Sequence, residues 1–172
     1  FGMNTYDEFM ASLAKLEGLG MKRLIVDLRE NEGGILPIAI RMINEFLPEG
    51  KLILYTQGKA SPRMDYNSNG KGKYQQLPLT VLIDEASASA SEIFAGAIQD
   101  YGLGSIVGTT TYGKGIVQQI FDLGDGTCVK LTMAEYYTPN GRNIHKKGIT
   151  PDVEVEYQRD ENNPNADNQL DA

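Results

Sequence analysis

The chain has 172 residues, of which 41% are hydrophobic, so it is long enough for one domain with a sizeable core. Its 23 acidic residues outnumber its 16 basic residues, and the net charge of −7 argues against a nucleic-acid-binding surface, which would be basic. No apolar run is as long as a membrane span, the first residues lack the pattern of a signal peptide, and the single cysteine excludes an intramolecular disulfide.

The first part of the chain is expected to alternate between helix and strand. A helix should open with the capping box Thr5-x-x-Glu8, and the apolar run 24–28 predicts a strand covered on both faces. A helix over 35–47 and a strand over 51–57 follow. The polar, glycine-rich segment 58–76 is too long for a simple connection and is interpreted as a mobile flap or a solvated insertion.

The second part begins with a strand over 79–85, which leads to the serine cluster SASAS (87–91) and a helix with one apolar face. After a short apolar run at 105–108, two β-like runs flank Asp125-Gly126 and predict a hairpin, and residues 153–157 form an edge strand. Residues 158–172 are acidic and have no apolar period, so we expect a catalytic core over 1–157 and a disordered tail or linker over 158–172. The alternation of strands and helices predicts an α/β layered domain.

Serines at the start of a helix, followed by Lys114 between two glycines, are the parts of a Ser/Lys nucleophile. Lysine can act as the base only when it is removed from water, and its neighbours Tyr112, Ile116 and Val117 could supply part of an apolar niche. If the segment after Lys114 is a strand, the side chains of Lys114 and Gln118 point to one face. The helix N-terminus offers unpaired N–H groups for an oxyanion.

Other interpretations of these residues stay open at this point. Ser89-x-x-Glu92 fits a capping box, so Ser89 could simply cap the helix. The segment 108–114 matches the phosphate-binding pattern G-x-x-x-x-G-K, but Gly115 stands where Ser or Thr should follow and the next run is β-like. Cys128, expected to be buried, could pair with His145, the one histidine, which is expected in a loop. No metal-binding motif is present, and no cofactor is expected.

Taken together, five blocks resemble the carboxy-terminal processing, or tail-specific, serine proteases. They are KRLIVDLRENEGG (22–34), SASASEIFAGAIQDYG (87–102), TYGKGIVQQ (111–119), LTMAEYYTPNGRNI (131–144) and KGITPD (147–152). The resemblance implies a crotonase-like/ClpP-like ββα core within the α/β class. It also implies that Ser89 is the nucleophile, Lys114 the base and Gln118 the residue that orients the base, with the N–H groups of Ala90 and Gly34, or else Gly33, as oxyanion donors.

The resemblance further implies a serine endopeptidase that cleaves protein or peptide substrates near a free C-terminal tail, through an acyl-enzyme. Such proteases carry a PDZ domain upstream, which we expect in a longer parent chain, and work in the periplasm or another extracytoplasmic envelope compartment. Glu32 and Tyr112 depart from the commoner pattern of the family, which has Pro or Gly and Phe at these places. The alternative is a non-catalytic peptide-binding or scaffolding domain on the same fold.

Overall fold

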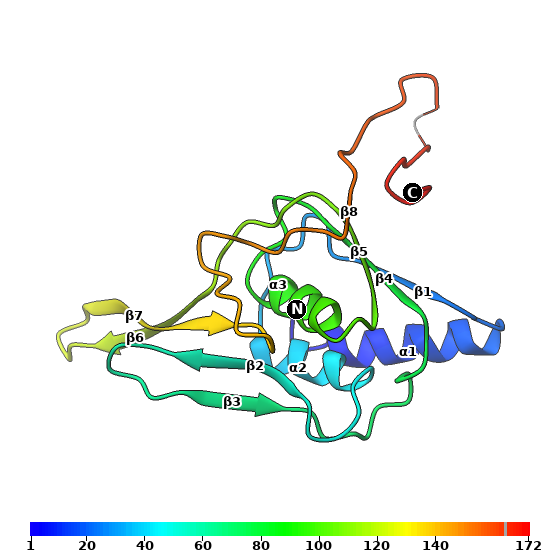
Figure 1. The fold of residues 1–172 in the computed structure, drawn as a ribbon. Helices are drawn as coiled ribbons and strands as arrows, with labels where there is room; N and C mark the ends of the chain where they lie inside the picture. The colour runs from blue at the N-terminus through cyan, green and yellow to red at the C-terminus, as the bar shows by residue number, and fades with distance from the viewer. Residues whose placement is uncertain (164) are drawn as a thin grey trace.

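The computed structural model describes residues 1–163 and 165–172. In chain order the elements are α1 (Thr5–Gly18), β1 (Leu24–Asp27), α2 (Leu36–Asn44), β2 (Leu52–Gln57), β3 (Met64–Asn67), β4 (Leu79–Ile83), α3 (Ala90–Asp100), β5 (Gly104–Gly108), β6 (Ile116–Asp122), β7 (Cys128–Tyr137) and β8 (Val153–Glu154) (Figure 1). They form one four-stranded sheet in the order β1-β4-β5-β8 and another in the order β3-β2-β7-β6. The predicted α/β class is confirmed.

The first sheet is parallel, and its centre explains the apolar runs of the sequence. β4 pairs with β1 on one side and β5 on the other, and its Val81 and Ile83 are fully buried. The expectation that β1 is covered on both faces was wrong, because Ile25 is 49% exposed. β1 is an edge strand of the sheet. Helix α1, which comes just before it in the chain, packs against α2. β8 is the expected edge strand, paired with β5 over only two residues.

Helix α3 lies at the centre of the domain and carries the serine cluster at its N-terminal end (Figure 1). Its residues 90–98 are all buried, and it packs against α2, β5 and β2. Phe94 meets Phe46 edge-to-face with ring centroids 6.1 Å apart, a geometry that aromatic pairs favour. Burial on all sides fixes α3 in place, so the loop before it has a rigid support. Among the described residues, no helix is long and apolar enough to cross a bilayer.

The second sheet is antiparallel, and one of its strands was not anticipated. Within the segment 58–76, β3 pairs with β2 through Leu54 and Tyr66, so residues 64–67 belong to the sheet and not to a mobile flap. β3 is an edge strand of four mostly exposed residues, and it therefore lacks the alternation that would have predicted it.

The hairpin predicted at Asp125-Gly126 is confirmed, and β6 and β7 extend from the body of the domain as a ribbon (Figure 1). Gly126 has a φ of 87°, which glycine adopts at little cost in a tight turn. Cys128 pairs with Asp122 at the far end of the ribbon and is exposed, so the expectation that it is buried was wrong.

The start of α1 also differs from expectation. Asn4 precedes the first helical residue, and the Thr5 hydroxyl accepts a hydrogen bond from the Gly2 N–H at 2.8 Å. The Thr5 capping box therefore does not form, because Thr5 is already inside the helix.

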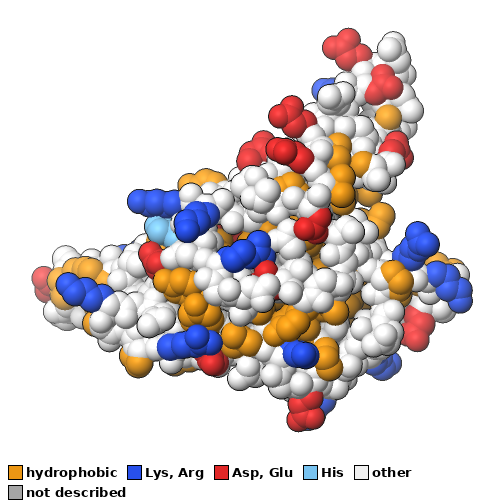
Figure 2. Space-filling model, in the orientation of Figure 1, with side chains coloured by type: hydrophobic (Ala, Val, Ile, Leu, Met, Phe, Trp, Pro, Cys, Tyr) orange, Lys and Arg blue, Asp and Glu red, His pale blue; other side chains and the backbone are white. Residues whose placement is uncertain are grey.

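The acidic segment after residue 157 has no regular element in its described part, and residue 164 lies outside that part. Asp and Glu side chains gather along it (Figure 2). Its end nevertheless contacts the domain: Gln169 is 2% exposed, and its side-chain amide donates to the Val155 carbonyl at 2.6 Å. The division of the chain at residue 157 stays a prediction.

Candidate active site

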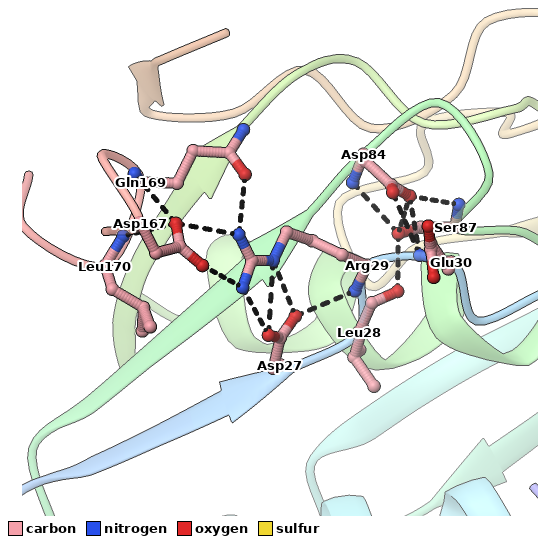
Figure 3. Close-up of polar contacts among 9 residues, drawn as sticks. All are labelled: Asp27, Leu28, Arg29, Glu30, Asp84, Ser87, Asp167, Gln169 and Leu170. Atoms are coloured by element: carbon pink, nitrogen blue, oxygen red, sulfur yellow. Dashed lines mark hydrogen bonds and ion pairs between the residues drawn. The ribbon is translucent and has the colours of Figure 1, made fainter. Parts of the chain in front are cut away.

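The candidate site is built where β1 and β4, paired side by side, both end. The turn 28–34 follows β1, and the serine loop, residues 84–89, follows β4. The Asp84 carboxylate joins the two, because it accepts hydrogen bonds from the N–H groups of Glu30 and Ser87, both at 2.9 Å (Figure 3). It also accepts from the Ala86 N–H at 3.0 Å. One side chain thus holds both segments in a single arrangement.

The serines of SASAS have different surroundings. The buried Ser87 hydroxyl donates to the Leu28 carbonyl at 2.7 Å, and the buried Ser91 hydroxyl donates to the Asn31 carbonyl at 2.8 Å. Ser89 is half-buried and has a φ of 57° and a ψ of −112°, a region that residues with a Cβ rarely adopt. Such strain costs on the order of 1–3 kcal/mol and concentrates at functional sites. The serine that the resemblance implies as nucleophile is therefore the strained one, and its role stays a prediction.

Glu92 is the site residue that sequence reasoning understated. It is fully buried, and its Oε2 accepts from the N–H groups of Ser89 at 2.7 Å and Lys114 at 2.8 Å. Its Oε1 accepts from the Thr111 hydroxyl at 2.6 Å and the Gly113 N–H at 2.7 Å. The capping pattern predicted only the local bond to Ser89, whereas the other partners lie 19 to 22 residues away. A single carboxylate oxygen thus binds the main chains of the predicted nucleophile and the predicted base.

Lys114 lies beside Ser89 through its main chain, but its side chain is not in an apolar niche. The residue is exposed, and its ammonium group makes no hydrogen bond or ion pair with any described residue. Tyr112 is 69% exposed, and Ile116 and Val117 are only half-buried. The expectation that these neighbours bury the lysine was therefore wrong for the chain by itself.

Gln118 lies on β6 and is exposed. Its side-chain amide is 3.5 Å from the Thr132 hydroxyl of β7, at the long limit of a hydrogen bond. The ladder shifts register between Val117 and Gln118. Because an irregularity of this kind interrupts the alternation of side chains, the argument that placed Lys114 and Gln118 on one face does not apply. The role of Gln118 stays a prediction.

The predicted oxyanion donors lie where the turn meets the serine loop. Gly33 has a φ of 98°, and a Cβ there would be 2.9 Å from the Ala90 nitrogen and 2.5 Å from the Ala88 carbonyl oxygen. Only glycine fits so close an approach. Gly34, with a φ of 142°, lies against the backbone of Phe1, whose carbonyl accepts the Ile35 N–H at 2.8 Å.

A cavity of about 940 Å³ opens at the same edge of the parallel sheet, but none of the predicted catalytic residues lines it. Arg29 crosses it, with its Nη2 2.6 Å from Asp27 and 2.7 Å from Asp167 (Figure 3). Hydrogen bonds to Asp27 and then Asp167 raise the pKa of Arg29, and the bond to Arg29 lowers the pKa of Asp167. The carboxylates in the wall are Asp27, Glu30, Asp84, Glu85, Glu154, Glu156 and Asp167.

The capping box of Ser89 and Glu92 is present at the start of α3, but the cysteine and phosphate-binding arrangements considered from the sequence are not supported by the geometry. Cys128 is at the far end of the β6–β7 ribbon, whereas the main chain of His145 packs against Gly115. The segment 108–114 leads into β6, so no helix N-terminus follows it to hold a phosphate. Across residues 1–163 and 165–172, no group of three His, Cys, Asp or Glu side chains is placed to hold a metal ion.

The chain is similar to known proteases over most of its length. It is 41% identical over 156 residues to a carboxyl-terminal-processing protease of Synechocystis sp. and 37% identical over 156 residues to a probable CtpA-like serine protease of Staphylococcus epidermidis. These matches cover 91% and 90% of this chain but only 36% and 32% of the relatives, so the chain spans about a third of their length.

The fold agrees with the sequence matches. A solved structure of a photosystem II D1 C-terminal processing protease superposes with a TM-score of 0.86 and 35% identity, over 91% of this chain and 40% of that one. The fold predicted from the resemblance is therefore confirmed. A sequence profile of peptidase family S41 matches residues 1–155, and this chain accordingly belongs to peptidase family S41, together with carboxyl-terminal processing serine proteases.

Proposed function

We propose that this chain is the catalytic core of a serine endopeptidase that cleaves protein substrates near their C-termini through a Ser89/Lys114 dyad. The observation that carries the proposal is the Glu92 carboxylate, whose Oε2 binds the main chains of Ser89 and Lys114 at 2.7 and 2.8 Å. Burial of a carboxylate costs desolvation energy that its hydrogen bonds must offset, and here these bonds hold together two segments 22 residues apart. Membership of family S41 supports a serine peptidase.

The proposed mechanism gives each of these groups one role. Lys114 takes the proton of the Ser89 hydroxyl while the oxygen attacks the scissile carbonyl carbon, and the carbonyl oxygen becomes an oxyanion. The N–H groups of Ala90 and Gly34 stabilise that charge, aided by the N-terminal end of α3. The tetrahedral intermediate then expels the amine, which takes the proton back from Lys114, and water hydrolyses the acyl-enzyme.

The proposal requires that Lys114 be covered before it can act. Removal from water favours the neutral amine, which is the form that accepts a proton. Because Lys114 is exposed in this chain, a bound substrate or another part of a longer protein must cover it. Gln118 would orient the amine once it is covered.

The substrate and its capture are part of the same proposal. Relatives of this chain are named for carboxyl-terminal processing, which supports a protein substrate with a free C-terminal tail. The relatives are about three times as long as the match, which leaves room for a PDZ domain that would present the tail by adding it to a sheet edge. We place the enzyme in the periplasm or another compartment outside the cytoplasm.

Two substitutions test the dyad. Ser89→Ala and Lys114→Ala should each lower cleavage of an unfolded protein with a free C-terminus by about 10⁴-fold or more, the scale seen when a nucleophile or base is removed. Lys71→Ala is the matched control, because Lys71 is also exposed between two glycines but lies outside the site. Retained turnover in Lys114→Ala would refute the base assignment.

The exposed side chain of Lys114 keeps a second candidate in view, a non-catalytic peptide-binding or scaffolding domain on the same fold. Such a domain would bind peptides through a site that never assembles a dyad. Its Ser89 would not react with a fluorophosphonate, even in the intact protein with substrate present, whereas the protease should be labelled at Ser89 alone.

A further inference from the structure

We propose that Asn31 is a positioning residue that determines which N–H group faces the substrate: it engages the N–H of Gly33 and so leaves that of Gly34 to act with Ala90. Ser91 is the residue that holds Asn31 in this position. The inference rests on the proposed function and deepens it, because it assigns the structural basis of the oxyanion site rather than its existence.

Asn31 makes contacts through both of its carbonyl oxygens. Its side-chain Oδ1 is 3.0 Å from the Gly33 nitrogen and 3.0 Å from the Ser91 hydroxyl. Its main-chain oxygen accepts from the Ala88 N–H at 3.0 Å and is 2.8 Å from the same Ser91 hydroxyl. An asparagine that accepts from the N–H two residues onward forms an Asx turn. Here the turn is joined to the serine loop by two further contacts.

The free donors are found next to this turn. The Gly33 N–H is engaged by Asn31, whereas the N–H groups of Gly34 and Ala90 donate to no acceptor within the described part of the chain. A Cβ on Gly33 would be 2.9 Å from the Ala90 nitrogen, so the amide that follows Gly33 in the chain lies close to the amide of Ala90. Two neighbouring unpaired N–H groups beside a serine are the parts of an oxyanion hole.

Ser91 makes the arrangement rigid. It is fully buried on α3, two residues after Ser89, and its single proton is shared between the two oxygens of Asn31. Because α3 is buried along residues 90–98, Ser91 ties the turn to a helix that is packed on all sides. The turn and the serine are therefore set by the same helix.

A merely structural role for Asn31 and a positioning role predict different effects on ligand binding. Loss of a structural contact lowers the fraction of folded protein and weakens all ligands alike. Loss of a positioning contact weakens only ligands that place negative charge on the oxyanion, since transition-state analogues depend on contacts that ground-state ligands do not make.

The test compares two ligands in the intact protein: a short apolar peptide aldehyde and the primary alcohol of the same sequence. With the aldehyde, Ser89 Oγ bonds to the carbonyl carbon, the C=O π bond breaks, and the hydroxyl proton passes to Lys114, which leaves a charged oxygen in the oxyanion site. The alcohol lacks the terminal aldehyde carbonyl and binds only non-covalently. The ratio of the two affinities therefore cancels the shared non-covalent contacts and reports on formation of the adduct, whose negative charge lies in the oxyanion site.

Asn31→Ala should weaken the aldehyde about 100-fold, the lower end of the effect of losing one oxyanion donor, and change the affinity of the alcohol by less than about threefold. Asn31→Ser should lose less, because a serine hydroxyl can form the weaker version of the same turn. Ser91→Ala should shift the ratio in the same direction, and the double variant should lose less than the two single effects combined, as expected of contacts in one network.

Matched controls are available elsewhere in the chain. Asn69 is exposed and accepts from the N–H of Lys71 at 3.0 Å in the same i to i+2 pattern, and the buried Ser68 donates to the Pro48 carbonyl. Asn69→Ala and Ser68→Ala should leave the ratio unchanged. An unchanged ratio in both Asn31→Ser and Ser91→Ala would overturn the inference. If the wild-type protein binds the aldehyde no better than the alcohol, the proposed function itself fails, and the role of Asn31 with it.

Discussion

Replacement of Glu92 by Gln is the most informative perturbation of this site, because its cost can be worked out from the contacts. A glutamine has one acceptor oxygen and one amino group in place of two oxygens. If the amino group replaces Oε2, the N–H groups of Ser89 and Lys114 both lose their acceptor. If it replaces Oε1, the Gly113 N–H loses its acceptor and the Thr111 hydroxyl must turn away.

Either orientation therefore loses one or two hydrogen bonds to a charged group, each worth about 1.5–3 kcal/mol, so the free energy of unfolding should fall by about 2–6 kcal/mol. A domain with a typical stability of about 5–15 kcal/mol would still fold in most of that range. Urea unfolding followed by circular dichroism measures the change, with an unaltered slope as the sign that only the native state has been affected.

The effect on activity separates the two consequences of the substitution. Per folded molecule, labelling of Ser89 by a fluorophosphonate should slow by about 10-fold or more, because the proposed nucleophile and the proposed base lose their common anchor. Glu45→Gln is the control: Glu45 is also buried, but it accepts from the Tyr6 hydroxyl at 2.7 Å and the Lys73 N–H at 3.2 Å, away from the site. A stability loss below about 1 kcal/mol, or labelling as fast as in the wild-type protein, would refute the reasoning for Glu92.

Two further predictions concern the turn and the C-terminal segment. Gly33→Ala should lower the melting temperature and abolish fluorophosphonate labelling, because its Cβ would lie 2.5 Å from the Ala88 carbonyl oxygen. Gly18→Ala, which has open space around its Cβ, should change neither the melting temperature nor the labelling. Normal labelling of Gly33→Ala would contradict this prediction. The pKa of Asp167 is lowered from its ordinary 3.8, first by the hydrogen bond to Arg29, so this contact is fully present above about pH 4 and is lost as pH falls through the lowered pKa. Hydrogen exchange at the Gln169 N–H, which donates to the Asp167 carboxylate at 3.1 Å, should accelerate below pH 4 relative to its intrinsic rate, and a constant protection factor down to pH 2 would exclude the contact.

The sequence predicted well those elements whose pattern of residues matches their surroundings in the fold. β4 and α3 carry apolar runs because they are buried by several neighbours, and the turn at Asp125-Gly126 depends on local backbone geometry. β3 was missed because pairing with β2, rather than its own pattern, makes it a strand. Ile25 and Cys128 were misjudged since exposure depends on what lies across a sheet, which a run of apolar letters does not encode.

The same distinction applies to the site. The strained Ser89 and the close approach of Gly33 fall in blocks that the sequence marks clearly, with serines before a helix and glycines after a strand. The reach of Glu92 to Thr111, Gly113 and Lys114 was not predictable from a capping pattern, because it depends on how β5 returns beside α3. The exposure of Lys114 was not predictable either, since its apolar neighbours in the chain do not fold over it.

The way in which Lys114 is held has a consequence for latency. Its peptide nitrogen is anchored, while the four-carbon stem beyond it is unrestrained in the described chain. In the proposed function, the change from a resting to a working state involves rotation about the bonds of this side chain, a motion of picoseconds to nanoseconds while it is exposed, followed by its coverage. The proposed dyad therefore keeps the peptide groups of Ser89 and Lys114 where Glu92 holds them.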